Sequence, residues 1–170
     1  MGKRLALDEE MEHCWRATPV DGDLQATLEK LNVLHDAGAC ATELIGLAES
    51  GHYLIVKQPL CHAVGEIDDD RNRAAEAMLA VTPRHSLGRE IRVFWLGGQA
   101  WCLGDLHPRN IMRDAAGQPT IIDALIGPLP PRVLRAAPRL LASVEKARAR
   151  REGRPFATDD AFASVSDDAL

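Results

Sequence analysis

Aromatic side chains, long hydrophobic runs and closely spaced cysteines are all scarce in this sequence. Phe, Trp and Tyr make up 4% of the 170 residues, so the core has to be mostly aliphatic. No apolar run approaches the roughly 20 residues that a membrane-spanning helix needs, so no membrane partner is expected. Internal repeats and low-complexity blocks are lacking too. The 46% of apolar and 26% of charged residues fit a soluble globular protein of about one domain.

The cysteines show neither a disulfide framework nor a zinc motif. They lie far apart, at Cys14, Cys40, Cys61 and Cys102. No C-x-x-C pair and no secretory segment is evident, so we expect reduced thiols and a cytoplasmic protein. His13 and His62 each adjoin a cysteine, but neither pair has the ligand spacing of a structural zinc site.

Positive charge is concentrated in one segment of a chain that is acidic overall. The formal net charge is −5, yet residues 132–154 carry eight Lys or Arg against two Glu. If this segment is helical, its basic side chains can neutralise the phosphates of a nucleic acid. More often it is solvated or pairs with acidic side chains, so nucleic-acid binding is a minor alternative.

The first periodic segments predict a helix, a hairpin and a turn out of the sheet. Leucines at helical spacing follow Asp23 and run to Gly38, which predicts a helix over residues 24–37. Residues 43–48 and 52–56 read as two short strands joined by a Glu-Ser-Gly turn. The chain then leaves the sheet at Pro59, which has no amide hydrogen to donate.

Later segments alternate between helices and hairpins, so the fold class is α+β. We predict helices over 71–81 and 133–151, the second with a kink or break near Ala137 because Pro138 follows. Two further β pairs are expected, at 91–96 with 99–103 and at 110–113 with 120–123. The polar tail, residues 153–170, is expected to be flexible.

One stretch carries a recognisable chemical pattern. Asp105 is followed five residues later by Asn110 and then by a short hairpin that ends at Asp123. In Mg²⁺-assisted phosphoryl transfer, one carboxylate accepts a hydrogen bond from the attacking hydroxyl, and an amide oxygen and a second carboxylate hold the metal. The structural alternative is that the three residues only cap a turn and two strand ends, as Asp and Asn often do.

Gly104-Asp105-Leu106-His107-Pro108-Arg109-Asn110 resembles the catalytic loop of the protein-kinase-like superfamily, in the branch that includes the aminoglycoside phosphotransferases and other atypical kinases. The resemblance implies Asp105 as the catalytic base, and Asn110 and Asp123 as Mg²⁺ ligands. His107 stands where typical protein kinases have Lys. His107 and Pro108 are expected to support the loop.

Upstream segments are similar to other parts of that family. The helix that contains Glu29 looks like the kinase αC, and Gln58, Pro59 and Leu60 look like the hinge that binds adenine. The region is also similar to the small kinase domain of phage and plasmid polyvalent proteins. This implies a reduced kinase-like fold, with a truncated N-lobe (1–57) of a short antiparallel sheet plus one helix. A mostly helical C-lobe (58–152) carries the catalytic loop on β-hairpins.

The sequence departs from the family in ways that bear on function. Residues 1–23 contain neither a G-x-G-x-x-G loop nor a V-A-I-K strand, which leaves Lys3 and Arg16 as candidate phosphate anchors unless a partner chain completes the N-lobe. The family's Phe-Gly after the metal-binding Asp is replaced by Ala124-Leu125. We expect an ATP- and Mg²⁺-dependent phosphotransferase acting on a hydroxyl of a protein or a small molecule. The alternative is an inactive pseudokinase or adaptor.

Overall fold

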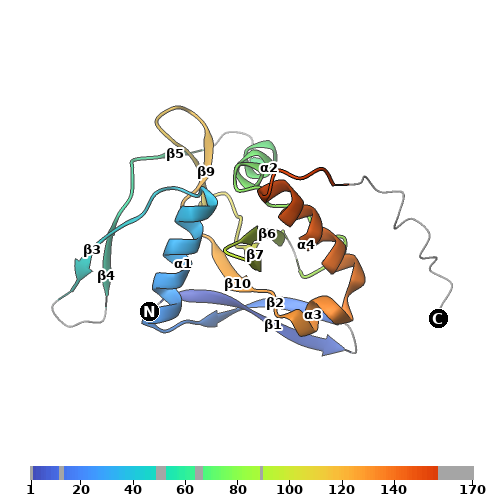
Figure 1. Ribbon diagram of the computed structural model, residues 1–170. Helices are drawn as coiled ribbons and strands as arrows, with labels where there is room; N and C mark the ends of the chain where they lie inside the picture. Colours follow the sequence, from blue (N-terminus) through green and yellow to red (C-terminus); the bar gives the residue numbers. More distant parts are fainter. Residues whose placement is uncertain (1, 12–13, 49–52, 64–66, 89, 157–170) are drawn as a thin grey trace.

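The computed structural model describes residues 2–11, 14–48, 53–63, 67–88 and 90–156, and it is α+β as the sequence predicts (Figure 1). The helices are α1 (Leu24–Ala37), α2 (Ile67–Ala77), α3 (Pro131–Ala136) and α4 (Pro138–Arg151). The strands are β1 (Lys3–Met11), β2 (Cys14–Asp21), β3 (Glu43–Leu47), β4 (Leu54–Lys57), β5 (His62–Ala63), β6 (Arg92–Leu96), β7 (Gln99–Gly104), β8 (Ile111–Arg113), β9 (Pro119–Ile121) and β10 (Leu125–Pro128).

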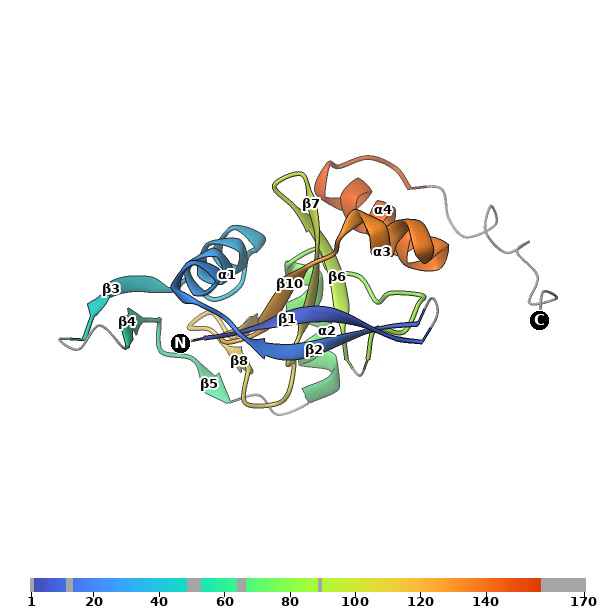
Figure 2. The ribbon, with the colours of Figure 1, turned by 90° about the horizontal axis from the view of Figure 1, so that it is seen from below.

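The long hairpin β1–β2 is an element that the sequence analysis does not predict. Its strands pair antiparallel from Lys3 opposite Asp21 onwards. Leu5 and Trp15 are buried and belong to the core. β1 passes so close to β10 that a Cβ on Gly127 would overlap the carbonyl oxygen of Leu5. The hairpin therefore covers one side of the molecule and depends on a glycine to do so (Figure 2).

Helix α1 has the predicted limits, and its two caps explain them. The Asp23 carboxylate accepts a hydrogen bond from Ala26 N at 2.8 Å. At the other end Gly38 adopts φ 98°, the left-handed conformation that ends many helices. The predicted hairpin follows as β3 and β4, with Glu43 opposite Lys57, and lies beside α1 at the edge of the molecule (Figure 1).

A three-stranded antiparallel sheet in the order β10-β7-β6 separates two halves of the core. Side chains alternate between its faces, as the period of a strand requires. Val93 and Cys102 pack with β1, β2, α3 and α4, whereas Phe94, Trp101 and Leu103 pack with α1, α2, β8 and β9. The second half of the core joins residues from the predicted N-lobe part and C-lobe part, so the two parts share one core.

The C-terminal helices break where the sequence predicts. Ala137 lies outside helical geometry with φ −127° and ψ 81°, and Pro138 starts α4. The preceding helix differs from the prediction, since α2 begins at Ile67 and ends at Ala77. It ends early because Leu79 takes a left-handed conformation with φ 58°. β5 and β10 are also additional to the prediction. Among the described residues, the part from 58 to 152 contains three helices and six strands and is not mostly helical.

A buried ion pair fastens α2 to the hairpin β8–β9. Asp70 is fully buried, and both its carboxylate oxygens accept hydrogen bonds from Arg113, at 2.7 and 3.1 Å. The pair fixes the hairpin that follows Asn110 against the helix. In the described part of the chain, no helix has the length and apolar character to cross a bilayer. The predicted flexible tail falls, from residue 157 onwards, outside the described residues.

Candidate functional site

Two antiparallel ladders place the predicted site residues at neighbouring strand ends. β7 ends at Gly104, which pairs with Leu125 at the start of β10, so Asp105 leaves one strand where the other is about to begin. β8 pairs with β9, and that ladder extends by one bond, from Ile122 N to Asn110 O at 3.0 Å. Asp105, Asn110 and Asp123 therefore all lie at strand ends of what we term the 104–123 segment.

The side chains of Asp105 and Asn110 are in direct contact. Asn110 Nδ2 donates to Asp105 Oδ2 at 3.0 Å and to the Asp105 carbonyl oxygen at 2.9 Å. Asn110 is 8% exposed, and Asp105 lies at the surface with a left-handed φ of 62°. Non-glycine residues seldom hold that conformation unless their surroundings impose it, and such positions concentrate at functional sites. The two bonds use the amide nitrogen, and among the described residues no hydrogen bond to the Asn110 amide oxygen is found.

His107 and Leu106 hold the loop between these two residues. The His107 Nδ1 accepts a hydrogen bond from Arg109 N at 3.1 Å, so the neutral ring carries its proton on Nε2. That Nε2 lies 3.6 Å from Asp105 Oδ1. Leu106 is fully buried and anchors the loop to the core. His107 is thus placed to orient the carboxylate, and Pro108 occupies the turn beside it.

A buried lysine faces the third predicted residue. Lys30 Nζ donates to Asp123 Oδ1 at 3.0 Å, with 10% of the lysine side chain and 68% of the aspartate side chain exposed. Sequence analysis offered Lys3 and Arg16 as phosphate anchors, but Arg16 pairs with Glu10 at 2.9 Å on the N-terminal hairpin. The signal for Lys30 was its place on the apolar face of α1, in line with Leu34 and Ala37.

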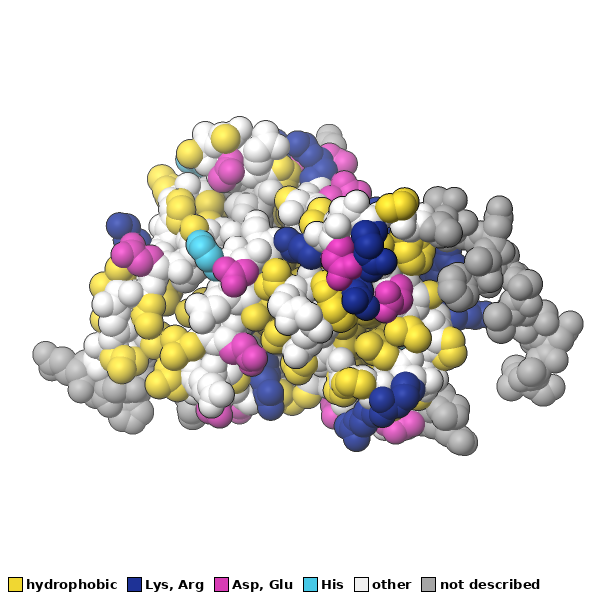
Figure 3. All heavy atoms as spheres, viewed as in Figure 1, with side chains coloured by type: hydrophobic (Ala, Val, Ile, Leu, Met, Phe, Trp, Pro, Cys, Tyr) yellow, Lys and Arg dark blue, Asp and Glu magenta, His cyan; other side chains and the backbone are white. Residues whose placement is uncertain are grey.

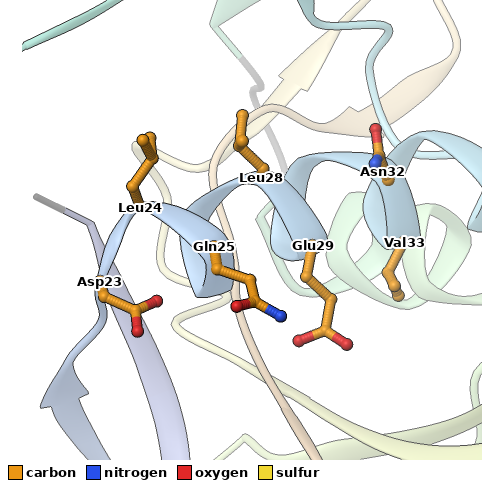
Figure 4. A pocket seen from close by; sticks show the side chains of 7 residues that line it. All are labelled: Asp23, Leu24, Gln25, Leu28, Glu29, Asn32 and Val33. Carbon is orange, nitrogen blue, oxygen red and sulfur yellow. The ribbon is translucent and has the colours of Figure 1, made fainter.

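Glu29, the predicted αC glutamate, is not brought to this place. It is exposed and points to the same side of α1 as Gln25, away from Leu28 and Asn32 (Figure 4). The hollow of about 690 Å³ there is lined only by α1 and its N-cap, without any of the three predicted site residues. The helix therefore presents a cation to Asp123, in place of the expected carboxylate.

Lys30 and Asp123 sit at the polar end of a mostly apolar cavity of about 410 Å³, a size typical of small-molecule sites. Its other lining residues come from the residue before β1, from α1, from the β3–β4 region and from the residue after β9: Gly2, Leu24, Thr27, Leu31, Thr42, Leu47, Tyr53, Leu54, Val56, Gln58 and Ile122. Apolar walls with a few polar groups at one end suit a ligand with a flat apolar part and a charged part.

Only one of the three predicted hinge residues lines this cavity. Gln58 Nε2 donates to Thr42 Oγ1 at 2.7 Å and to the Ile122 carbonyl oxygen at 2.8 Å. Its side chain ties the chain after β4 to the residue before Asp123. Pro59 and Leu60 are outside the lining, and Leu60 is 80% exposed. The hinge prediction thus matches the cavity at Gln58 only.

Comparisons with protein-family models, curated proteins and solved structures find no match for this chain. The arrangement of its own side chains is therefore what bears on function. It combines a surface carboxylate held by an amide, a second exposed carboxylate and a buried ammonium group beside an apolar cavity. Anionic and metal-bound ligands are the ones that such a set can hold.

Proposed function

We propose that this chain is a kinase-like phosphotransferase that moves the γ-phosphoryl group of ATP to a hydroxyl, with Mg²⁺. The observation that carries the proposal is the Lys30 ammonium, buried at the end of an apolar cavity and 3.0 Å from Asp123. A buried cation needs an anionic partner, because an uncompensated charge there is costly. The exposed Asp123 is that anionic partner in the structure, and the phosphates of a nucleotide would add further negative charge beside Lys30.

Asn110 and Asp123 carry the kind of oxygen donor that suits a magnesium ion. Mg²⁺ prefers oxygen ligands and uses few protein side chains together with phosphate oxygens. Asn110 offers its amide oxygen, because its nitrogen is already committed to Asp105, and Asp123 offers an exposed carboxylate. When bound, the ion would neutralise charge on the phosphates. Asn110 and Asp123 are the residues that would hold it.

Asp105 is positioned to accept the proton of an attacking hydroxyl. Its carboxylate lies at the surface, where an acceptor can approach, and Asn110 fixes one oxygen at 3.0 Å. His107 Nε2 lies 3.6 Å from the other oxygen. A base held in this way contributes to catalysis through orientation as well as proton transfer. The acceptor would be the hydroxyl of a protein Ser, Thr or Tyr side chain, or that of a small molecule.

The apolar walls of the cavity suit the adenine ring. Leu31 comes from α1, and Leu54 and Val56 come from β4, so the lining closes on two sides. Gln58 contributes polar atoms at the edge, where hinge groups read a base in the family that the sequence resembles. Adenine in this cavity would direct the phosphates toward Lys30 and Asp123.

Calorimetric titration with Mg-ATP tests the binding half of the proposal. Lys30→Met should weaken binding at least about tenfold, because it removes a charge-assisted contact to phosphate. Asp123→Asn should weaken the Mg²⁺-dependent part of the affinity. Glu29→Gln is the matched control, since its side chain lies on the same helix but outside the cavity. No heat at millimolar Mg-ATP would remove the proposal.

Transfer of radiolabelled phosphate tests the catalytic half. Asp105→Asn should keep nucleotide affinity within about twofold and lower transfer by about 100-fold or more, as expected for loss of a general base. Autophosphorylation and a panel of protein and small-molecule acceptors are the assays. Equal transfer by the wild type and Asp105→Asn would rule out this role of Asp105.

An inactive nucleotide- or partner-binding protein is the second candidate. The Lys30–Asp123 ion pair favours it, because it engages a carboxylate oxygen that a metal would use. Apolar side chains gather on the surface at the β3–β4 side of the molecule (Figure 3). The exposed ones there include Leu44, Ile45 and Tyr53. Nucleotide binding without any Asp105-dependent transfer is the result that distinguishes this candidate.

Nucleic-acid binding receives less support from the basic segment than its composition suggests. Arg132 lies over the Trp15 ring at 5.8 Å, and Arg148 lies over Trp95 at 5.0 Å. Arg151 donates to the carbonyl oxygens of Trp95 and Met78. These guanidinium groups are used within the molecule, so a mobility shift with nucleic acid is not the expected result.

A further inference from the structure

Two cysteines that are far apart in the sequence meet beside the cavity. Cys40 Sγ lies 3.9 Å from Cys61 Sγ. Cys40 follows the C-cap of α1, and Cys61 follows the chain that leaves β4. The β3–β4 ladder ends at Glu43 opposite Lys57, and the bond from Gln58 to Thr42 continues the pairing outward. The two thiols therefore lie at the base of this hairpin.

The surroundings of Cys40 and Cys61 suit a reversible disulfide bond better than a buried packing contact or a metal site. Both thiols are partly exposed, so a small reagent can reach them. Among the described residues, no group of three His, Cys, Asp or Glu side chains that could hold a metal ion is found. Cys40 N donates to Ile121 O at 2.9 Å, which fixes the first cysteine against β9.

We propose that Cys40 and Cys61 are a thiol–disulfide pair that closes the base of the β3–β4 hairpin when a low-molecular-weight disulfide oxidises it. This inference does not rest on phosphotransfer. A disulfide has a sulfur separation of about 2.05 Å, so the sulfurs have to approach by roughly 2 Å. Rotation of the side chains and a small shift of the surface segment before Cys61 would supply that movement.

The chemistry balances as two exchange steps with glutathione disulfide as oxidant. The Cys61 thiolate attacks one sulfur of the oxidant, which forms a mixed disulfide and releases one glutathione thiolate. Cys40 then loses its proton to solvent and attacks the Cys61 sulfur, which releases the second glutathione thiolate. The protein loses two protons and two electrons, and one glutathione disulfide takes them up to become two glutathione thiols.

The environment of Cys40 sets the order of these steps. Burial, together with the hydrogen bond to Cys61, raises the pKa of the Cys40 thiol to about 11. Cys40 is therefore almost fully protonated at neutral pH and a poor first nucleophile. It reacts second, when the mixed disulfide on Cys61 is already within reach. Cys102 is excluded from exchange because burial raises its pKa to about 12 and the side chain is inside the core.

The bond would stiffen one wall of the cavity. It encloses residues 40–61, a loop that contains the whole β3–β4 hairpin, and it lies next to Thr42 and Gln58, which line the cavity. Closing a loop of this length removes conformational freedom from the unfolded chain. We expect the oxidised protein to melt roughly 5–10 °C higher than the reduced one.

Peptide mapping of the full chain tests the proposal directly. The native protein is equilibrated with glutathione disulfide, alkylated and digested with trypsin, which cleaves after Lys30, Lys57 and Arg71. The expected product is peptide 31–57 joined to peptide 58–71, with Cys14 and Cys102 unlinked. Two reduced peptides, or glutathione left on either cysteine at equilibrium, would overturn the proposal.

Serine variants supply matched controls. Cys61→Ser and Cys40→Ser should each abolish the joined peptides and the rise in melting temperature. Cys40→Ser should also retain glutathione on Cys61, because the second step is blocked. Cys14→Ser should leave the cross-link unchanged, since Cys14 lies on β2. A rise in melting temperature that persists in Cys61→Ser would contradict the assignment.

Discussion

The 104–123 segment and the β3–β4 hairpin contribute to the same candidate site, but they are built in opposite ways. Leu106, Ile111 and Ile121 are almost completely buried and fix the first of them in the core. The hairpin instead exposes side chains such as Ile45 and Tyr53. The end that would bind metal and phosphate is therefore held by packing before any ligand arrives, whereas the apolar wall relies on a short ladder and a few hydrogen bonds.

The largest effect on stability should come from a substitution at the close contact between β1 and β10, which supports the packed 104–123 segment. Gly127→Ala would force a Cβ into the Leu5 carbonyl group, so β1 and β10 must separate. We expect a loss of about 3 kcal/mol or more in the free energy of unfolding, measured with urea. Gly46→Ala, on β3, is the control, because its Cβ would meet nothing within 4 Å. Equal losses of unfolding free energy in the two variants would contradict the contrast between the packed segment and the exposed hairpin.

The buried ion pair below the 104–123 segment should give the next largest effect. Asp70→Asn leaves Arg113 without a charged partner, although Arg113 is partly exposed and regains water. A loss of about 2 kcal/mol in unfolding free energy is expected. Asp68→Asn removes an ion pair to Arg71 in which Asp68 is 87% exposed, and it should cost less than about 0.5 kcal/mol. Comparable losses would mean that burial is not what matters.

On the hairpin side, the expected effect is on binding more than on stability. Gln58→Ala removes the bonds to Thr42 and to the Ile122 carbonyl oxygen. Mg-ATP affinity should fall about fivefold, the equivalent of one net hydrogen bond, with less than about 1 kcal/mol lost in stability. Lys57→Ala, which breaks only an exposed pair with Glu43, should change affinity less than about twofold. A change in stability alone would show that Gln58 serves the fold only.

A surface cluster at the end of α4 provides the smallest effect. The hydrogen bond from Arg148, and then that from Arg154, lowers the pKa of Glu152. A lowered pKa in the folded state gives stability that is present above the unfolded pKa and is lost as the pH falls through the folded one. Glu152→Gln should therefore slightly flatten the melting temperature profile below about pH 4.5. An unchanged profile would show that the cluster contributes nothing.

Local signals predicted most of the elements after residue 23. The leucine spacing and caps of α1, the Gly97-Gly98 turn and the break at Ala137 each depend on a few neighbouring residues, and the structure confirms them. The hairpin β1–β2 was missed because its strands carry many charged side chains and are held by contacts with β10, far away in the sequence. Periodicity in a short window does not contain that information.

For the candidate site, sequence spacing anticipated which residues lie at neighbouring strand ends, but not their partners. The contact of Asn110 with Asp105 follows from a loop that the motif itself encodes. Glu29 was chosen because its helix resembles the kinase αC, and the neighbouring Lys30 was missed because only the orientation of α1 decides which of the two faces Asp123. The meeting of Cys40 and Cys61 likewise depends on how two loops are placed, and no spacing rule indicates it.

The most direct test of the central claim is a crystal structure with Mn²⁺ and a non-hydrolysable ATP analogue. The predicted result is an anomalous peak between the Asn110 amide oxygen and the Asp123 carboxylate, with a phosphate oxygen at Lys30 and the base in the apolar cavity. A metal and nucleotide bound elsewhere, with the Lys30–Asp123 pair still closed on itself, would contradict it.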